Sequence, residues 1–393
     1  MKPINTVLTI NGGSSGIKFA LYEAGVLLKL LFSGELEYHD KSSKFKLLNG
    51  LTLQKEIIDI EIDDENDFPN ILITKLEKQD GFADVRAIGH RIVHGMKHTE
   101  SQIITPELLN ELKNISIYDP EHLPREIKLI EAFRKRFPLM QQVACFDTAF
   151  HTSMPPVAKL LPVPRWLYKK GIQRYGFHGL SYAYLLQELE NIAGKETASG
   201  KIIFAHLGNG ASLAAVKNGK CLDTSMGFTP ASGIMMSTRS GDLDPGVGWY
   251  LMQFEKFTPT QFNHLINHES GLLGISETSG DMRELLEIQN TDNRAAEAIE
   301  LFCYQNKKYI GTFAAVLGGL ESLVFSGGIG EHSPEVRRVI CNGLQFLGIE
   351  LDEIKNINNA AVISADTSKV CVRVIKTNEE IMIARITCNV LNY

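Results

Sequence analysis

Hydrophobic residues recur along the chain in short runs separated by glycine-rich turns. An apolar run covers 7–10, a turn of small residues follows at 12–16, and a second alternating run begins at Ile17. Runs of this length between turns are typical of β-strands. Over 294–317, apolar residues recur three and four positions apart and predict an amphipathic helix that ends at Gly318, facing either the core or a dimer partner. Alternating strands and helices indicate an α/β fold.

The pattern at the start of the chain is repeated in its second half. Residues 7–30 read as strand, glycine turn, strand, short turn and strand, and residues 202–222 read in the same order. A third strand runs into glycines within "LVFSGGIGEH", 323–332. Such a repeat predicts two duplicated domains, each presenting a glycine turn toward a shared cleft. We expect the break between them near 147–155.

Composition and charge narrow the classes of protein. The chain has 393 residues, 44% of them hydrophobic and 22% charged, with a net charge of −6. This length predicts two domains, and the acidic balance argues against a nucleic-acid partner. No uncharged apolar run approaches the roughly 18 residues of a membrane span, and the first residues lack the pattern of a secretion signal. Six scattered cysteines without a Cys-x-x-Cys pair favour a reducing, cytoplasmic location.

The glycine turns suggest anion binding. Backbone N–H groups of such turns converge on phosphates, because glycine has no Cβ to keep the anion away. In the first turn, Ser14 and Ser15 would add hydroxyl donors, Asn11 would face a metal, and Lys18 would either add charge or point to solvent. A single turn of this kind is equally well a plain hairpin. Three of them favour a nucleotide, although neither a Walker nor a GxGxxG pattern is present.

Four polar stretches follow predicted strands or turns: "GHRIVHG" (89–95), "FDTAFH" (146–151), "RYGFHGLSY" (174–182) and "STRSGDLDPG" (237–246). They supply Arg91, Asp147, His178 and Arg239, an inventory that suits phosphoryl transfer. The histidines flanking Arg91 are spaced like a zinc pair, but the glutamate of an HExxH site is missing. A structural histidine at 178 and a surface loop at 237–246 are the alternatives.

These stretches, with "INGGSSGIKF", "HLGNGASLAAVKNGKCLDTSMGFTPASGIMMSTRSGDLDP", "SGGIGEHSPEVR" and "TNEEIMIAR", together resemble the acetate kinase family of acetate, propionate and butyrate kinases. The resemblance runs in order from residue 7 to about 385. It implies the actin, Hsp70 and sugar-kinase superfamily, with two actin-like (ribonuclease H-like) α/β domains and a nucleotide cleft between them. The domains would be 1–150 plus 380–393 and 151–379, with a homodimer formed mainly through the second.

The resemblance also implies a reaction. The γ-phosphoryl group of ATP would move reversibly to acetate, giving acetyl phosphate and ADP, with Mg²⁺ or alternatively Mn²⁺. Propionate or a more polar short carboxylate is the alternative acceptor. A nucleotide-switched module of the same superfamily is the alternative from another class, but such a switch has no need of a second anion site.

The family's site residues carry over onto matching positions of this sequence. The metal would be held by Asn11 and Glu379. The catalytic residues would be Arg91, Asp147, His178 and Arg239. The carboxylate and its acyl tail would contact Arg91, Val93, His122, Phe177 and Pro230. The nucleotide would contact Lys18, His206, Leu207, Gly208, Asn209, Gly210, Asp281, Met282, Arg283, Gly328, Ile329, Gly330, Glu331 and His332.

Asp147 has a special position in this scheme. A sugar kinase needs an aspartate that accepts a proton from the attacking hydroxyl. A carboxylate acceptor is already ionised near neutral pH and needs no base. We therefore expect Asp147 to orient Arg91 or water on the metal.

Four positions depart from the family pattern. Gly16 replaces a serine, Tyr182 stands where histidine is common, and His332 replaces an asparagine near the adenosine pocket. Glu121 occupies an apolar position of the acyl pocket, where an unpaired carboxylate would be costly. We expect Glu121 to turn to solvent, the alternative being that it meets a cation on a more polar substrate.

Overall fold

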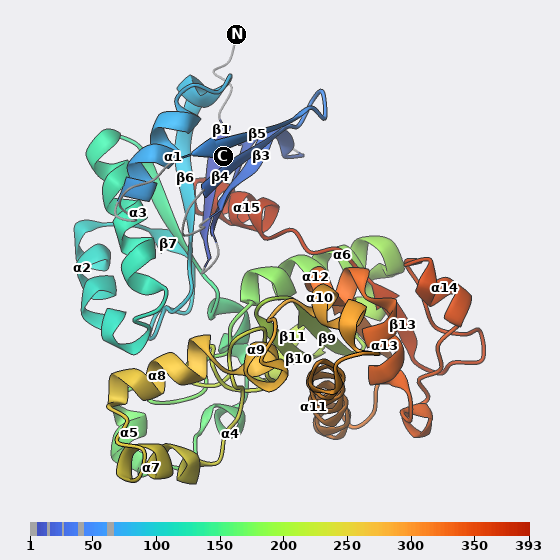
Figure 1. Ribbon diagram of the computed structural model, residues 1–393. Coiled ribbons are helices and arrows are strands. Elements are labelled where there is room, and N and C mark those ends of the chain that lie inside the picture. The colour runs from blue at the N-terminus through green and yellow to red at the C-terminus, as the bar shows by residue number, and fades with distance from the viewer. Residues whose placement is uncertain (1–5, 14–15, 26, 38–42, 61–66) are drawn as a thin grey trace. The chain divides into compact units, whose positions relative to one another are not determined.

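The computed structural model describes residues 6–13, 16–25, 27–37, 43–60 and 67–393. The chain divides into two compact units (Figure 1). Unit 1 comprises Met1–Ala149 and Asn378–Tyr393, and unit 2 comprises Phe150–Thr377. Each unit is built on its own β-sheet.

In the described residues, unit 1 contains an eight-stranded sheet in the order β5-β4-β3-β2-β1-β6-β8-β7. Its strands are β1 (Thr6–Gly12), β2 (Gly16–Glu23), β3 (Lys29–Glu37), β4 (Ser43–Asn49), β5 (Lys55–Ile60), β6 (Val85–Ile92), β7 (Gln102–Ile103) and β8 (Gln141–Phe146). β1, β2 and β3 form the antiparallel meander predicted for residues 7–30. β6 runs parallel to β1, and β8 runs parallel to β6.

Helices cover both faces of this sheet. They are α1 (Phe68–Leu76), α2 (Pro106–Ile115), α3 (Leu123–Arg136) and α15 (Glu379–Leu391), with short 3-10 turns η2 (Phe82–Asp84) and η3 (Ser116–Tyr118). The last helix, α15, packs against β1, β2 and β6, so the end of the chain completes the unit that contains its start (Figure 1).

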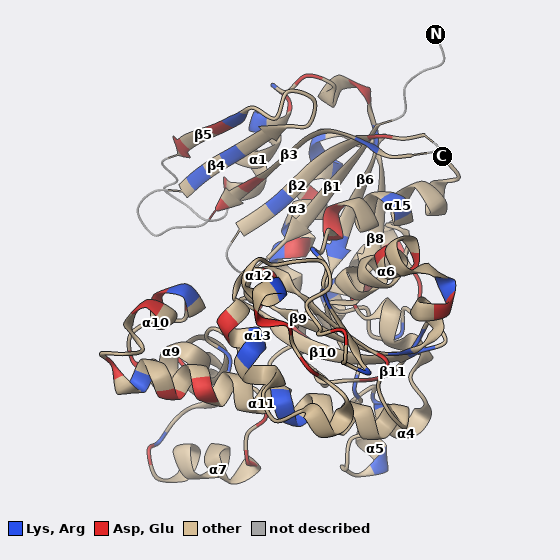
Figure 2. Cartoon of the chain, turned by 90° about the vertical axis from the view of Figure 1, so that its right-hand side faces the viewer, with Lys and Arg blue, Asp and Glu red and all other residues tan. Residues whose placement is uncertain are grey.

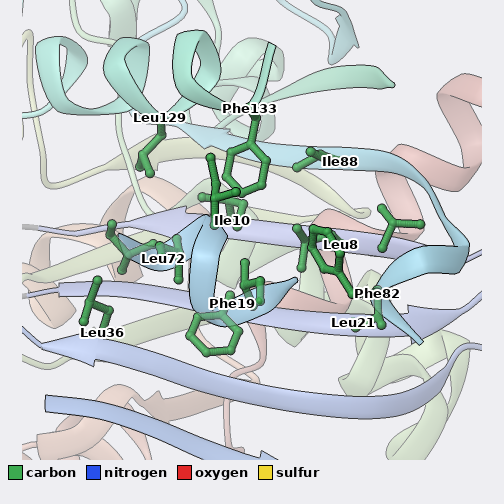
Figure 3. Close-up of a cluster of buried hydrophobic side chains, with 14 of the residues drawn as sticks. Leu8, Ile10, Phe19, Leu21, Leu36, Leu72, Phe82, Ile88, Leu129 and Phe133 are labelled. Atoms are coloured by element: carbon green, nitrogen blue, oxygen red, sulfur yellow. The ribbon is translucent and has the colours of Figure 1, made fainter. Parts of the chain in front are cut away.

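Strand alternation explains why both faces are buried. Leu8 and Ile10 belong to a cluster with Leu129 and Phe133 of α3, as Figure 3 shows. Val7, one position before Leu8, packs instead with residues of α15. Successive strand side chains point to opposite faces, so a continuous apolar run supplies two cores at once.

Unit 2 repeats this topology in the described residues, with the sheet order β11-β10-β9-β12-β13. Its strands are β9 (Lys201–Leu207), β10 (Ala211–Lys217), β11 (Lys220–Thr224), β12 (Ser322–Ser326) and β13 (Cys371–Val374). β9, β10 and β11 form an antiparallel meander, followed by parallel β12 and β13, just as β1–β3 are followed by β6 and β8. The predicted repeat of the hairpin pattern is therefore confirmed. Asn218 and Gly219 close the second hairpin with positive φ angles of 52° and 69°.

The helices of unit 2 are α4 (Pro156–Lys159), α5 (Arg165–Lys169), α6 (Gly179–Ser199), α7 (Pro245–Gln253), α8 (Pro259–His268), α9 (Gly271–Ser276), α10 (Met282–Ile288), α11 (Asn293–Leu317), α12 (Gly327–His332), α13 (Pro334–Cys341) and α14 (Glu353–Ile357). Two 3-10 turns, η4 (Ala149–Ser153) and η5 (Gln345–Leu347), complete the secondary structure. α11 is the helix predicted over 294–317. It ends at Gly318 in the left-handed conformation and buries Ala298, Phe302 and Ile310, so one face of it is core. Within the described residues, no helix is both long and apolar enough to cross a membrane.

Candidate active site

Arg91 and Asp147 meet at the carboxyl ends of two neighbouring parallel strands. β6 ends just after Arg91, and Asp147 follows the last residue of β8. Arg91 Nε donates to Asp147 Oδ2 at 2.9 Å, and Nη2 lies 2.7 Å from the same oxygen. Arg91 Nη1 donates to the carbonyl of Gly12 at 3.1 Å, which ties the arginine to the end of β1. The expected contact between Asp147 and Arg91 is thus present.

Electrostatics keep this arginine charged. The Asp147 side chain is fully buried, and that of Arg91 is 13% exposed. Burial alone lowers the pKa of Arg91, but Asp147, then Glu379 and Glu126, outweigh it and raise the pKa above its usual value. The result is a fixed, mostly enclosed cation at the carboxyl end of the sheet, where α/β folds commonly bind ligands.

Asn11 and Glu379 lie together although 368 residues separate them. Asn11 Nδ2 donates to Glu379 Oε2 at 2.9 Å and to Glu380 Oε1 at 3.1 Å. Lys18 is exposed on β2, and the charges of Glu380 and Glu379 raise its pKa above the ordinary value. Ser14 and Ser15, predicted as donors in the same turn, lie outside the described residues.

This acidic corner fits a magnesium ion by the chemistry of its groups. Two carboxylates and an amide oxygen are hard ligands, and Mg²⁺ uses one or two carboxylates with water and substrate phosphates completing its shell. Within the described residues, no three His, Cys, Asp or Glu side chains form a denser metal cluster. Glu380 was not singled out from the sequence. Its position beside Glu379 in "TNEE" was the available signal.

The predicted acyl-pocket residues of unit 1 are anchored by buried carboxylates. Val93 is buried, and its N–H donates to both oxygens of Glu126 at 3.2 and 3.1 Å. His122 Nδ1 lies 2.9 Å from Asp119 Oδ1. Burial raises the pKa of Glu126 well above its usual range, despite the opposing charge of Arg91. Sequence reasoning missed Glu126, because nothing in its neighbourhood distinguishes it from a solvated helix residue. Glu121, which was expected to face solvent, is half-buried.

In unit 2 the loop that leads to His178 is held from several sides. Arg174 Nη1 donates to the carbonyls of Thr224 and Ser225 at 2.9 and 3.1 Å. His151 Nε2 lies 2.9 Å from the carbonyl of Phe177, which is itself buried. Burial lowers the pKa of His151 to about 4, so its imidazole is neutral and Nε2 donates.

His178 occupies an unusual backbone conformation. Its φ and ψ angles are 58° and 24°, in the left-handed region, directly before α6. A non-glycine residue there costs free energy and persists only where the surroundings enforce it, which is common at functional sites. Its ring stacks on His206 with centroids 4.4 Å apart. Ser181 Oγ lies 2.8 Å from His206 Nδ1 and 2.8 Å from Thr377 Oγ1.

The turn after β9 brings two predicted catalytic residues together. A Cβ placed on Gly210 would lie 3.1 Å from His178 Nε2 and 3.7 Å from Arg239 Nη1. Arg239 Nη1 also donates to the carbonyl of Pro230 at 3.3 Å. Gly208 N donates to the carbonyl of Gly210 at 3.0 Å, closing the turn. Leu207 is buried, and Asn209 accepts from the backbone of the loop that carries Arg239.

The residues predicted to enclose the adenosine lie on two short helices of unit 2. Asp281 caps α10 by accepting from Arg283 N, and Arg283 Nη2 pairs with Asp281 at 2.6 Å. In α12, Glu331 is buried and accepts from the Gly327 N–H at 3.0 Å. A Cβ on Gly328 would meet no atom within 4 Å, and the His332 side chain is 74% exposed.

The five-strand order β3-β2-β1-β6-β8 of unit 1 recurs as β11-β10-β9-β12-β13 in unit 2, and this duplicated α/β architecture is that of the actin-like ATPase fold. The model of the acetokinase family matches residues 6–385. The acetate kinase of Rhodopseudomonas palustris (strain TIE-1) is 42% identical over 389 residues, covering 97% of both chains. The propionate kinase of Citrobacter rodentium (strain ICC168) is 41% identical and covers 96% of this chain and 95% of its own.

Solved structures agree with this match. The crystal structure of Porphyromonas gingivalis acetate kinase has a TM-score of 0.86 and 38% identity, covering 98% of this chain and all of its own. The crystal structure of a propionate kinase from Francisella tularensis has a TM-score of 0.91 and 35% identity, and it also covers 98% of this chain and all of its own. This chain belongs to the acetokinase family.

Proposed function

We propose that this protein transfers the γ-phosphoryl group of ATP reversibly to acetate, giving acetyl phosphate and ADP, with Mg²⁺ as its cofactor. Family membership over residues 6–385 supports the reaction class. The observation that carries the choice of acceptor is Arg91, a mostly enclosed cation held by the buried carboxylate of Asp147. Such a cation suits a small carboxylate, because it cancels the repulsion between two anionic reactants.

On the acceptor side, the chain's own groups bind and orient the carboxylate. Arg91 supplies the charge, and Asp147 fixes the direction of the guanidinium through Nε and Nη2. No residue needs to accept a proton, since the acceptor is ionised near neutral pH. Val93, held by Glu126, would line the acyl tail in unit 1, as Phe177 and Pro230 would from unit 2.

On the donor side, residues of unit 2 stabilise the phosphoryl group in transfer. Arg239 Nη1 and His178 Nε2 both lie against the Gly210 turn, where they would donate to the equatorial oxygens. The backbone of the turn from His206 to Gly210 would face the β- and γ-phosphates. Each of these groups would act by position and charge.

The metal would be held by Asn11 and Glu379, with Glu380 and Lys18 adjusting the local charge. When bound, Mg²⁺ would neutralise part of the charge on the phosphate oxygens. The proposal extends to Mn²⁺ as a substitute, because the same oxygen ligands suit it.

The acyl preference is tested with a panel of acids. Purified protein is incubated with Mg-ATP, hydroxylamine and formate, acetate, propionate, butyrate, glycolate or succinate, and acyl hydroxamate is measured. Product with acetate or propionate supports the proposal and ranks the pocket. Product with glycolate or succinate alone would favour a polar acceptor and make Glu121 the specificity residue. No product with any acid, with ATP still bound, would overturn it in favour of a nucleotide switch.

A homodimer through unit 2 is part of the proposal. α7 carries no charged residue, as Figure 2 shows, and neither α7 nor α8 contains a buried residue. Val247, Trp249, Tyr250 and Phe254 are exposed large hydrophobic residues of this segment, with Trp249 65% exposed. An uncharged apolar helix of this kind is typical of a protein interface, and a second copy would cover it.

We place the protein in the cytoplasm, where its unpaired cysteines would stay reduced.

A further inference from the structure

A buried chain of three side chains connects Tyr182 to His178 within unit 2. His178 Nδ1 lies 2.8 Å from Ser212 Oγ, and the hydroxyl of Tyr182 hydrogen-bonds to the same serine oxygen. Tyr182 and Ser212 are fully buried, and His178 is 8% exposed. Tyr182 N donates to the carbonyl of His178 across the first turn of α6, which fixes the spacing of the two side chains.

Ser212 imposes a direction on this chain, because its hydroxyl has one proton and donates to one neighbour only. When Tyr182 donates to Ser212, Ser212 donates to His178 Nδ1, and a neutral His178 carries its proton on Nε2. When His178 Nδ1 donates instead, a neutral His178 presents a lone pair at Nε2. Only the first arrangement lets neutral His178 donate a hydrogen bond from Nε2 to an anion.

The Nε2 atom is the end of His178 that faces the candidate phosphate turn. It lies 3.1 Å from the position of a Cβ on Gly210, and Arg239 Nη1 lies 3.7 Å from the same position. The proton on Nε2 is therefore the one that matters for phosphoryl transfer.

We propose that Tyr182, acting through Ser212, is a positioning residue that holds neutral His178 as the Nε2–H tautomer, ready to donate to the phosphoryl group in transfer. The inference rests on the proposed function for the role of His178. A phenol is a stronger proton donor than a serine hydroxyl, which favours the direction from Tyr182 to Ser212 to His178. His178 then serves as a donor without having to be an imidazolium.

A positively charged side chain lies against the same turn as the His178 ring. Tyr182 from α6, His206 from β9 and Arg239 from the loop after β11 are among the titratable or charged side chains near it. Of these three, Arg239 is a cation. A nearby positive charge disfavours a second one. His151, whose ring lies 5.8 Å from that of Tyr182, is neutral.

The tautomer is tested directly by nuclear magnetic resonance. Protein labelled with ¹⁵N-histidine is compared with its Tyr182→Phe and Ser212→Ala variants, and His178→Gln assigns the signal. We expect a protonated Nε2 and an unprotonated Nδ1 in the wild type, and a shift toward protonated Nδ1 in both variants. Tyr175→Phe is the matched control, because it removes a phenol that donates to the Gly171 carbonyl instead. A wild-type ring protonated on Nδ1, or spectra unchanged in Tyr182→Phe, would overturn the inference.

Kinetics give the second readout. The wild type should keep a flat kcat between pH 6 and 8. In Tyr182→Phe we expect kcat at pH 8 to fall about three- to tenfold below its value at pH 6, because an imidazolium still donates at low pH. Tyr175→Phe should keep the wild-type profile, and unchanged thermal unfolding would show that Tyr182→Phe folds. A flat profile in Tyr182→Phe would contradict the role. The resonance experiment does not require enzymatic activity. If no acid in the hydroxamate test gave product, the proposed function would be overturned, but the assignment of the His178 tautomer would still stand on the spectra.

Discussion

Arg91 meets Asp147 through a single carboxylate oxygen, with Nε at 2.9 Å and Nη2 at 2.7 Å from Oδ2. Two guanidinium contacts to one buried oxygen leave the arginine little freedom to turn. Asp147 is therefore placed to hold a cation, a task distinct from accepting a proton from substrate. The difference between these tasks is measurable.

A double-mutant cycle separates the two roles of Asp147. Arg91→Ala should lower kcat/KM for the acceptor by about 10²- to 10⁴-fold, the loss expected for one preorganised charge contact. Asp147→Asn should be less severe, and Arg91→Ala with Asp147→Asn should be no worse than Arg91→Ala alone, because Asp147 acts through Arg91. Losses that multiply would show an independent role such as a base. Arg239→Ala, with a similar loss, is the reference for a contact outside this pair.

Gly210→Ala should impair activity without unfolding the protein. The new Cβ would lie 3.1 Å from His178 Nε2, closer than an ordinary contact, and would displace the ring. A shift approaching 1 Å at a reacting group costs up to about 100-fold, so we expect kcat to fall by about 10- to 100-fold. Gly311→Ala is the control. It lies in α11 with no atom within 4 Å of its Cβ, and should keep activity while gaining up to about 1 kcal/mol of helix stability. Wild-type kcat in Gly210→Ala would contradict the placement of His178.

Glu126 should make stability depend on pH. Burial raises its pKa in the folded protein above the unfolded value. The stability it contributes is therefore complete below the unfolded pKa, about 4.3, and is lost as pH rises through the folded pKa. Glu126→Gln keeps an oxygen for the Val93 N–H but cannot ionise. Its free energy of unfolding should therefore rise relative to that of the wild type as pH rises. The gain is about 1.4 kcal/mol for each unit between the two pKa values.

Urea unfolding followed by circular dichroism from pH 4 to 8 measures this difference. Glu131→Gln in the same helix is the control, since it removes a carboxylate that is 44% exposed and screened by solvent. Curves for wild type and Glu126→Gln that stay parallel with pH would show that Glu126 titrates normally.

Trp249→Glu should convert a dimer into monomers. Burying a charge in an apolar interface without a partner costs several kcal/mol. Analytical ultracentrifugation of the wild type should give twice the chain mass of 43.7 kDa, and that of Trp249→Glu a single chain mass. Leu139→Glu, in an exposed loop of unit 1 where the side chain is 97% exposed, should leave the dimer intact. A monomeric wild type, or a dimeric Trp249→Glu, would refute an interface through α7.

Much of the fold was predictable because it follows from local pattern. The meander β1–β3 and its repeat β9–β11 are visible in the sequence as apolar alternation broken by glycine. The Asn218-Gly219 dipeptide predicts the second hairpin, because both residue types accept the positive φ angles that its turn requires. The helix over 293–317 is visible from its period and its terminal glycine. These signals arise from backbone conformation and side-chain direction, which depend on residues only a few positions apart.

The family motifs were also readable from the sequence, and with them Arg91, Asp147, His178 and Arg239 as residue types suited to phosphoryl transfer. What the sequence left open was which side chains hold them. Only the packed units place Glu380 beside Asn11, Val93 against Glu126, and Tyr182 against Ser212. These contacts join strands and helices whose pairing depends on sheet register and core packing. A buried polar group must find its partner wherever that packing brings one, and no local pattern records which one it will be.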